Sequence, residues 1–577
     1  MKNFSLSLLI MISISFMINN VYSQQWGLYT LYATKGGIKA YLIDTNSTSY
    51  HDWTFSSSKL TAYSAYLVPG DTLVRTYGYT SYGGMTGGGV TGAVQKVTWN
   101  GTVVWDFQYN SSSYTLHHDI CPMPNGDVLM ISYELKTVAQ ATQAGASSNV
   151  AIKAEKLIEV RPTGATTGTI VWEWHLWDHL CQNYNAAKDN YVTSIVNNPQ
   201  LLNINYTTGP DLSDRWHMNG VDYNAALDQI VVSIHFMNEV YVIDHSTTTA
   251  EAASHTGGNS GHGGDFLYRW GNPTAYGATG TTDFNTVHDA HWVSSDNPSY
   301  PNYLCAYNNK GGTGGVTAID VWNPPYNGYN YTLTLGSAYA PTTYSYRYTC
   351  PFTAPDEGNS QQLPNGNMLV SNFQGSIYEV NSSGTTVWTK TNANSTHAYR
   401  YTKCYVRGPQ ATAGVSSTSI TAGTPITLSS SAISVTEASP TYTYSWSSNP
   451  PGFNSASQNP SDTPMSTTTY TVTITDTNVG CSDTASVTVN VTVGIQENND
   501  YNNLRIFPNP TTGIININVD FTETNFNVFV YGLYGNLLLQ VKNIKTIDLS
   551  SLSNGIYYLS IKPENKNTIN KKLILIK

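Results

Sequence analysis

Charged residues are scarce in this chain of 577 residues: Asp, Glu, Lys and Arg together make up 11% of it. The balance is acidic, with a net charge of -10. We therefore expect no nucleic acid partner, because phosphate binding requires a basic surface. Any anionic ligand would need a pocket that is positive locally.

Cysteine is also scarce. Six cysteines occur, and no two form a Cys-x-x-Cys pair, which argues against a zinc site built on thiolates. In an oxidising compartment one or two disulfides are expected. Cys350 with Cys404 is the pairing we favour, because both fall near the end of one domain.

Long apolar runs are missing beyond the N-terminus, so we expect no transmembrane span. The one apolar run, at 6–17, follows Lys2 and precedes the small residue Ser23, a pattern typical of a signal peptide. We expect a signal peptide at 1–23 and export of the mature chain. A buried first helix is the alternative, which the weakly polar segment after the run does not favour.

Long amphipathic helix patterns are missing too, whereas Tyr, Thr, Ser, Asn and Gly abound, as in strand-rich proteins. Two phrases recur. A Pro/Asn-Gly turn followed by an apolar strand occurs at 124–130 and 364–370, and more loosely at 69–74. A Gly turn leading into a Trp-bearing strand occurs at 100–105, 168–172 and 384–388, with a variant at 264–270.

This repetition, with about six units between residues 25 and 408, predicts a six-bladed β-propeller. The stretch 397–406 resembles a last strand that pairs with the first blade and closes the ring. A β-helix is the alternative, but its repeats would be shorter and more uniform. The stretches 137–156 and 181–214 are expected to be long insertions that cap a site.

Residues 409–494 are rich in Ser, Thr and Pro and alternate polar with apolar side chains, which predicts an immunoglobulin-like sandwich. Trp446 is its expected core residue. We interpret this module as a spacer and find no chemistry in it, with weak carbohydrate contact as the alternative.

The last segment, 497–577, carries specific motifs at 504–513, 548–559 and 571–577. They resemble the C-terminal sorting domain of the type IX secretion system of Bacteroidetes. The resemblance implies a small β-sandwich without a catalytic role, a partner in the type IX secretion machinery, and export across the outer membrane. The protein is then expected to be secreted or displayed on the cell surface.

Three histidine segments, at 116–119, 216–219 and 288–291, occupy similar places in successive repeats. Equivalent positions of a propeller converge on its central channel, so we expect these imidazoles to line one pocket. Imidazole can act there as nucleophile, acid, base or metal ligand near neutral pH.

The sequence around these histidines resembles the arylsulfate sulfotransferase family. The stretches that carry the resemblance are 117–129, 216–233, 266–271 and 287–291. It implies a six-bladed propeller that moves a sulfuryl group from a phenolic sulfate to a phenol, with no nucleotide donor and no cofactor. Its small-molecule partners are then an aryl sulfate and a phenol.

The resemblance also implies roles for single residues. His288 matches the nucleophile that becomes a sulfohistidine, His217 matches an acid or base toward the phenol, and His118 matches a position that binds sulfuryl oxygens. The candidate catalytic residues are thus His288, His217, His118 and His235, and the candidate substrate-binding residues are His117, Asn219, His291 and Arg269.

One position departs from the family pattern, because His235 stands where an arginine is expected. Histidine offers fewer donors than the always-charged guanidinium fork, so sulfuryl stabilisation would weaken unless Arg215 or Arg269 compensates. Two alternatives stay open. The four candidate catalytic imidazoles can form a metal site, or the propeller can be a non-catalytic surface protein that binds glycans. Whether the chain is an active enzyme is left open by the sequence.

Overall fold

The computed structural model describes residues 27–69, 72–78, 85–434, 439–492, 504–518, 525–533, 536–564 and 568–577. The expected signal peptide at 1–23 lies outside these ranges. The chain divides into two compact units, 1–407 and 408–577, and each is described by itself. No helix among the described residues is long and apolar enough to cross a membrane.

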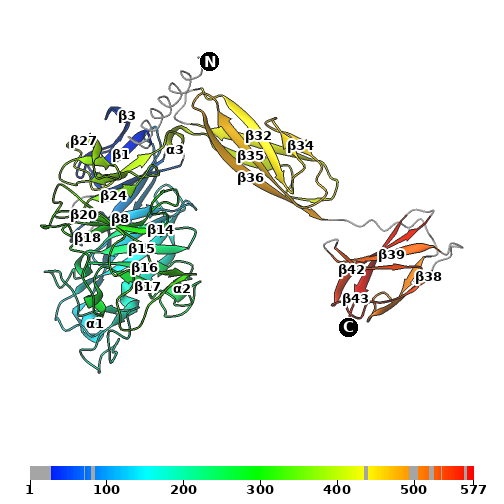
Figure 1. Ribbon diagram of the computed structural model, residues 1–577, viewed down its shortest axis with the longest axis horizontal. Coiled ribbons are helices and arrows are strands. Elements are labelled where there is room, and N and C mark those ends of the chain that lie inside the picture. The colour runs from blue at the N-terminus through cyan, green and yellow to red at the C-terminus, as the bar shows by residue number, and fades with distance from the viewer. Residues whose placement is uncertain are drawn as a thin grey trace, which may run out of the picture. The chain divides into compact units, whose positions relative to one another are not determined.

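Six four-stranded antiparallel sheets build the first unit in its described part, and they form a six-bladed β-propeller (Figure 1). Blades one to three, each written from the channel outward, contain the following strands: β28 (Ala398–Tyr401), β1 (Tyr29–Ala33), β2 (Lys39–Ile43) and β3 (Ser49–Thr54); β4 (Thr61–Val68), β5 (Thr72–Tyr77), β6 (Ala93–Val97) and β7 (Val103–Gln108); β8 (Tyr114–Pro122), β9 (Val128–Lys136), β10 (Ile152–Pro162) and β11 (Gly168–His175).

Blades four to six follow the same order. Their strands are β14 (Met218–Asn224), β15 (Gln229–Ile234), β16 (Glu239–Asp244) and β17 (Phe266–Trp270); β18 (Val287–Trp292), β19 (Leu304–Asn308), β20 (Ala318–Trp322) and β23 (Tyr346–Thr349); β24 (Asn359–Gln362), β25 (Met368–Ser371), β26 (Ile377–Val380) and β27 (Thr386–Lys390). The six-bladed propeller predicted from the repeats is thus confirmed.

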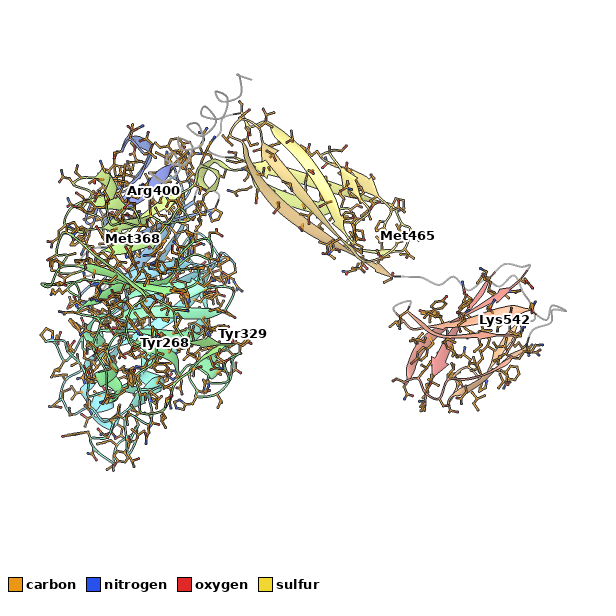
Figure 2. The ribbon with its side chains drawn as sticks, viewed as in Figure 1. Tyr268, Tyr329, Met368, Arg400, Met465 and Lys542 are labelled. Carbon is orange, nitrogen blue, oxygen red and sulfur yellow. The ribbon has the colours of Figure 1, made fainter. Side chains whose placement is uncertain are left out.

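Strand β28 closes the ring, because it pairs with β1 from the other end of the propeller sequence, as predicted. In Figure 1 the blue strand β1 accordingly lies at the same end of the propeller as the yellow-green β27. Arg400 of β28, labelled in Figure 2, is fully buried and forms an ion pair of 2.9 Å with Glu379 of β26. An ion pair between the first and last blades therefore accompanies the backbone pairing.

The recurring tryptophan strands prove to be the outermost strands of their blades, and each indole donates a hydrogen bond to the next blade. Trp105 of β7 reaches the carbonyl of Thr167 at 2.9 Å, and Trp388 of β27 reaches that of Thr45 at 2.9 Å. Trp53, Trp172 and Trp270 make the equivalent bonds. These repeated contacts explain why the Trp phrase recurs at blade spacing.

Carboxylates on the inner strands hold neighbouring blades together at the channel. Asp222 of β14 accepts the backbone N–H of Trp292 in β18 at 3.0 Å, and Asp289 of β18 accepts that of Ser360 in β24 at 2.8 Å. Because these bonds fix one inner strand against the next, side chains projecting into the channel are held in a defined arrangement.

Shorter elements lie between the blades. They are α1 (Val138–Gln143), η1 (Leu176–His179), β12 (Leu180–Cys181), β13 (Leu202–Asn203), η2 (His235–Met237), α2 (Thr249–Ala252), η3 (Pro273–Tyr276), β21 (Tyr326–Asn327), β22 (Asn330–Tyr331) and α3 (Lys403–Arg407). The insertion expected at 137–156 ends earlier, because β10 begins at Ile152. The expected Cys350–Cys404 disulfide is wrong, since Cys350 carries a free thiol.

The second unit holds a β-sandwich and a smaller strand domain. The sandwich has strands β29 (Gln410–Val415), β31 (Ile426–Ile433) and β34 (Ser461–Asp462) in one sheet and β30 (Ser419–Thr421), β36 (Cys481–Thr492), β35 (Thr468–Asp476), β32 (Tyr442–Asn449) and β33 (Asn454–Ser455) in the other. Trp446 is 1% exposed in its core, as predicted.

The C-terminal domain also has two sheets. They contain β37 (Arg505–Phe507), β38 (Ile514–Asn518) and β41 (Thr546–Asp548), and β40 (Leu537–Lys542), β39 (Phe526–Tyr531), β42 (Gly555–Pro563) and β43 (Ile569–Leu575). Its core gathers side chains such as Ile515, Val528 and Leu559, all buried. The predicted small β-sandwich ending in a basic strand is therefore present.

Candidate active site

The candidate site is positioned by bulges in the innermost strands. In β8, β14 and β18 the register with the next strand shifts at the histidine segment, between Leu116 and Ile120, between Met218 and Gly220, and between His288 and His291. A bulge places an extra residue in one strand and re-aims its side chains.

The backbone is strained at the same positions. His118 has φ 50°, His217 φ 63° and Asp289 φ 52°, all in the left-handed region that side chains other than glycine seldom adopt. Glu357, just before β24, joins them with φ 57°. Such conformations cost roughly 1–3 kcal/mol each and cluster at functional sites. The repeated strain therefore indicates that the functional site lies where these residues meet in the channel.

Four imidazoles form a chain of neighbouring rings there. The ring centroids of His118 and His217 lie 4.7 Å apart, those of His217 and His235 5.6 Å, and those of His235 and His288 5.0 Å. The structure thus brings together the four residues proposed as catalytic from the sequence, although they come from three blades and are separated by up to 170 residues in the chain.

The surroundings of His288 fix its tautomer. The amide nitrogen of Asn309 donates to the carbonyls of Ala354 and Glu357, so its Oδ1 accepts the Nδ1–H of His288 at 2.7 Å. The Nε2 of His288 therefore carries the lone pair, and it accepts the backbone N–H of Glu357 at 3.2 Å. Burial lowers the pKa of His288 to about 3, so the ring is neutral at physiological pH.

His217 is paired with a carboxylate. Its Nδ1 lies 3.0 Å from Asp214 and 3.1 Å from the hydroxyl of Tyr133. Burial opposes ionisation of Asp214, but the hydrogen bond and charge of His217 prevail and lower the pKa of that carboxyl. Asp214 holds the Nδ1 proton, which leaves the Nε2 of His217 for proton transfer, the arrangement of an acid–base dyad.

His118 lies deeper and is held by its neighbour His117, with 3.0 Å between the two Nδ1 atoms. One of these nitrogens must donate and the other accept. The His117 ring stacks on Tyr133 at 3.6 Å between centroids, and its Nε2 lies 3.0 Å from the buried Glu155 carboxyl. His117 is therefore held by Tyr133 and Glu155, and it orients the ring of His118 through the contact between the two Nδ1 atoms.

His235 occupies η2, directly after β15. Burial, followed by the charges of His288 and His217, lowers its pKa well below the ordinary value, so it is neutral. Asn219 lies beside it, with 3.5 Å between the amide nitrogen and Nδ1, and donates to the carbonyl of Val287 at 2.8 Å. Asn219 thus ties the His235 segment to the strand that carries His288.

Three lysines place positive charge around these rings. Lys35 pairs with Glu357 and lies 4.1 Å over the ring of Tyr63, which itself neighbours His118. After burial and the neighbouring imidazoles, its charge lowers the pKa of His118 and His288. Lys310 acts in the same way on His235, and Lys153 on His117. Lysine charges therefore act on these rings alongside the carboxylates of Asp214, Glu155 and Glu357.

A glycine-rich turn covers two of the rings. A Cβ atom added at Gly88 would overlap the ring of His217, and one at Gly89 would overlap that of His118. The carbonyl of Gly89 accepts the backbone N–H of His118 at 2.7 Å. Only glycine lets the backbone approach the imidazoles this closely.

Two of the residues proposed to bind substrate lie elsewhere. Arg269 is fully buried within blade four, where it pairs with Glu239 at 2.6 Å and donates to the carbonyls of Pro199 and Leu201. His291 points to the opposite side of the bulge from His288, with its Nε2 2.8 Å from the Gln362 side chain. Neither joins the chain of four imidazoles.

Arg215 does not replace the missing arginine either. Its guanidinium donates to the carbonyls of Leu212 and Ile204 and to the hydroxyl of Ser148. The positive charges that act on the imidazoles belong to lysines instead: Lys35 in the first blade, Lys153 on β10, and Lys310 in the loop after β19.

A cavity of about 330 Å³ lies along the channel next to His291. Its lining comes from all six innermost strands and includes Tyr66, Asp119, Asp222, Asp289, Ser360 and Tyr399. Burial raises the pKa of the Asp119 and Asp222 carboxyls. The channel thus has an acidic cavity on one side of the bulges and the imidazoles on the other.

Metal-ligand atoms converge at one place among the described residues, and it is not the four imidazoles. The group consists of His179, His255 and Asp265. The ring positions at the candidate site form a row of neighbours rather than a set of nitrogens around one point, which suits contacts along a substrate.

Comparison with known proteins decides the family. The profile of the arylsulfotransferase (ASST) family matches residues 76–393, more than half of the chain. The chain belongs to the arylsulfotransferase family. A second profile, that of the secretion system C-terminal sorting domain, matches residues 505–577. This arylsulfotransferase-like protein is therefore exported across the outer membrane by type IX secretion, to the cell surface or beyond it.

Solved structures resemble the chain only distantly. A protein of unknown function from Bacteroides caccae is 10% identical, with 64% of this chain and 94% of that chain covered and a TM-score of 0.35. The periplasmic gluconolactonase of Pseudomonas aeruginosa is 12% identical, covering 65% and 96%, with a TM-score of 0.31. Such low similarity carries no argument about function. No curated protein matches the chain.

Several residues at the site were not foreseen from the sequence. They are Lys35, Gly88, Gly89, Tyr133, Asp214, Asn309 and Glu357. Asp214 could have been noticed, because it lies three residues before His217. The others come from neighbouring strands or from other blades, and no local pattern in the sequence indicates their contact with the imidazoles.

Proposed function

We propose that this protein transfers a sulfuryl group from an aryl sulfate to a phenol through a sulfohistidine at His288. The observation that carries this proposal is the fixed tautomer of His288, a neutral ring next to His235 whose Nε2 carries the lone pair and accepts the backbone N–H of Glu357. A neutral imidazole is a competent nucleophile, and a covalent intermediate divides one difficult step into two easier ones.

In the first step the Nε2 of His288 attacks the sulfur of the aryl sulfate. The N–S bond forms as the bond between sulfur and the aryl oxygen breaks, and the electron pair leaves on that oxygen. Protonated His217 gives its Nε2 proton to the departing phenolate. Asp214 stabilises the imidazolium before transfer, and holds the neutral ring in place afterwards.

In the second step an acceptor phenol enters. His217, now neutral, takes the phenolic proton while the phenol oxygen attacks sulfur, and the N–S bond returns its electron pair to His288. The imidazolium of His217 is regenerated, so protons and electrons balance over the cycle. The backbone N–H of Glu357 must leave the Nε2 of His288 whenever sulfur is bound there.

The sulfuryl oxygens need donors in the transition state, where positive groups are worth most. We assign this contact to the Nε2 of His118, which carries a proton when Nδ1 accepts from His117. His235 is hydrogen-bonded to the carbonyl of Val287, so it donates to a sulfuryl oxygen only after gaining a proton. Lys35 supplies permanent positive charge from the first blade, although its ion pair with Glu357 partly offsets it. We assign to Lys35 part of the role that the expected arginine would have had.

Turnover of a chromogenic aryl sulfate tests the proposal. We expect the purified full-length mature protein to release phenol, and to release it faster when an acceptor phenol is added. His288→Ala should abolish release, whereas His262→Ala, which changes an exposed histidine outside the site, should leave it unchanged.

Absence of release from several aryl sulfates by correctly folded wild-type protein would contradict the proposal. So would equal rates in wild-type protein and His288→Ala. Retention of a glycan by both proteins, together with no release, would favour the non-catalytic binding propeller instead.

A further inference from the structure

A second histidine cluster lies on blade four and shares no residue with the candidate active site. It joins three elements: His179 ends η1, His255 follows α2, and Asp265 directly precedes β17. His179 and Asp265 are buried, whereas the side chain of His255 is 59% exposed. The cluster therefore has two buried members and reaches solvent on the side of His255.

Both imidazoles point the same nitrogen at the same carboxylate oxygen. The Oδ1 of Asp265 lies 2.8 Å from the Nδ1 of His179 and 2.7 Å from the Nδ1 of His255. The ligand atoms of all three residues lie within 4.8 Å of one another. Two imidazole nitrogens and a carboxylate are a ligand set that suits zinc.

The tautomer of His179 provides a second, independent observation. Its Nε2 lies 2.8 Å from the carbonyl of Ala252, which can only accept, so Nε2 carries a proton. A neutral ring then presents a lone pair from Nδ1 to the Asp265 carboxylate. Two lone pairs at 2.8 Å repel unless a cation or a further proton lies between them.

Fixing the far nitrogen on a backbone carbonyl is also how proteins orient histidines that bind metals. The local chain is shaped for this bond. A Cβ atom at Gly264 would overlap both the Ala252 carbonyl and the Nε2 of His179, and Trp174 stacks on the ring with planes 5° apart. His179 is thus a rigid ligand, and His255 is the adjustable one.

We propose that His179, His255 and Asp265 bind a zinc ion, with solvent completing the coordination. Ligand atoms about 2.0–2.1 Å from a tetrahedral zinc lie roughly 3.3 Å apart. Admitting the ion therefore requires the Asp265 carboxylate to shift by roughly half an ångström away from the rigid His179, and the exposed His255 to adjust with it. The ion would clamp the glycine-rich loop at 253–264 onto η1, away from the sulfuryl-transfer residues.

Zinc titration of the chelator-treated full-length mature protein tests this, with heat measured calorimetrically and bound metal counted after dialysis. We expect one tight equivalent of zinc, and a rise in the unfolding temperature when it binds. His255→Ala should weaken zinc binding by about 100-fold or more. Because His255 is exposed, this variant should fold normally.

Two control variants separate this site from other histidines. His262→Ala changes a neighbouring exposed histidine of the same loop, and His288→Ala changes the candidate nucleophile; both should keep the tight equivalent. Absence of tight zinc binding to the wild-type protein would overturn the proposal and leave a protonated His179 as the cation. Binding retained in His255→Ala, or lost in His288→Ala, would overturn it as well.

Cobalt substitution adds a readout of geometry. We expect the intense visible absorption of a low-coordinate cobalt(II) site with nitrogen and oxygen ligands, absent from His255→Ala and present in His262→Ala. A spectrum of weakly absorbing, fully hydrated cobalt in the wild-type protein would contradict the site. Neither result depends on sulfuryl transfer, so the two proposals fail separately.

Discussion

Hydrogen-bond partners, rather than the imidazoles themselves, assign the roles at the candidate site. His288 and His217 share a residue type, yet Asn309 fixes one as a neutral ring whose Nε2 accepts a hydrogen bond, whereas Asp214 accepts from the Nδ1 of the other. The hydrogen-bond partner therefore decides the proposed role: a neutral amide accompanies the nucleophile, and a carboxylate accompanies the acid–base group.

Asp214→Asn tests that assignment. An amide neither stabilises the imidazolium nor enforces the Nδ1 tautomer, so kcat for phenol release should fall by about 10²–10⁴-fold. Steady-state kinetics measure this, with Asp211→Asn, an exposed carboxylate nearby, as the matched control. An unchanged kcat in Asp214→Asn would refute the dyad.

Lys35→Met tests the positive charge. Removing the ammonium while nearly keeping the length of the side chain should raise KM for the anionic donor by about tenfold, since a contact with a charged group contributes about 1.5 kcal/mol or more. Lys35→Arg should retain most of the affinity. If Lys35→Met binds the donor as tightly as wild-type protein, the assigned role is wrong.

His235→Arg restores the family residue beside the nucleophile. Because arginine gives a permanent charge and a fork of donors, we expect kcat/KM to rise. Asn219→Ala provides the comparison, as it removes the tie behind His235 without adding charge. A fall in kcat/KM for His235→Arg would indicate that the neutral imidazole has its own role here.

At the scale of elements, the bulged inner strands explain what could and could not be predicted. The recurrence of the histidine segments was sufficient to predict convergence, because a propeller repeats its inner strand around one axis. It was not sufficient to place His291, since the bulge between His288 and His291 decides which side of the strand each ring faces.

Blade spacing was predictable for a similar reason. The Trp phrase recurs because each indole bonds to the next blade, so sequence and structure repeat together. Arg269 shows the limit of this reasoning. It belongs to a matching stretch, yet its partner Glu239 is on an adjacent strand, and the pair fills the blade rather than the channel.

His245 links blades three and four and gives a pH-dependent prediction. Burial opposes its charge, but hydrogen bonds to Asp228 and Glu159 prevail and raise the pKa to about 9. Since this folded-state value exceeds the unfolded value of about 6.5, the contribution is complete below that pH and is lost as the pH rises through 9.

In urea titrations of the wild-type protein, the free energy of unfolding should therefore fall by up to about 3 kcal/mol as the pH rises from about 6.5 to above 9. His245→Gln should be less stable at neutral pH and lack this part of the pH dependence. If the free energy of unfolding changes with pH in the same way in both proteins, His245 does not make this contribution.

For the whole molecule, closure of the ring by β28 is the main structural expectation. A chain that stops at Arg407 keeps β28 and its ion pair with Glu379, so we expect a cooperative propeller. A chain that stops at His397 leaves the edge of β1 unpaired and should aggregate or lose cooperative unfolding. Circular dichroism during heating compares them, and equal melting curves would refute closure.

The sorting domain places the protein outside the cell, so an aryl sulfate for the proposed reaction would come from the surroundings. Fold class and export could be read from the sequence, because repeats and terminal motifs are local patterns. The identity of donor and acceptor could not, because residues that contact His288, such as Glu357, come from segments far from it in the sequence.

Trapping the covalent intermediate is the most direct test of the central claim. The mature protein is mixed with excess aryl sulfate without acceptor, quenched in alkali to preserve an N–S bond, digested, and analysed by mass spectrometry. The account predicts one added sulfuryl group on the peptide that contains His288, which disappears when a phenol is supplied. A sulfuryl group on another residue, or phenol release without any labelled peptide, would contradict it.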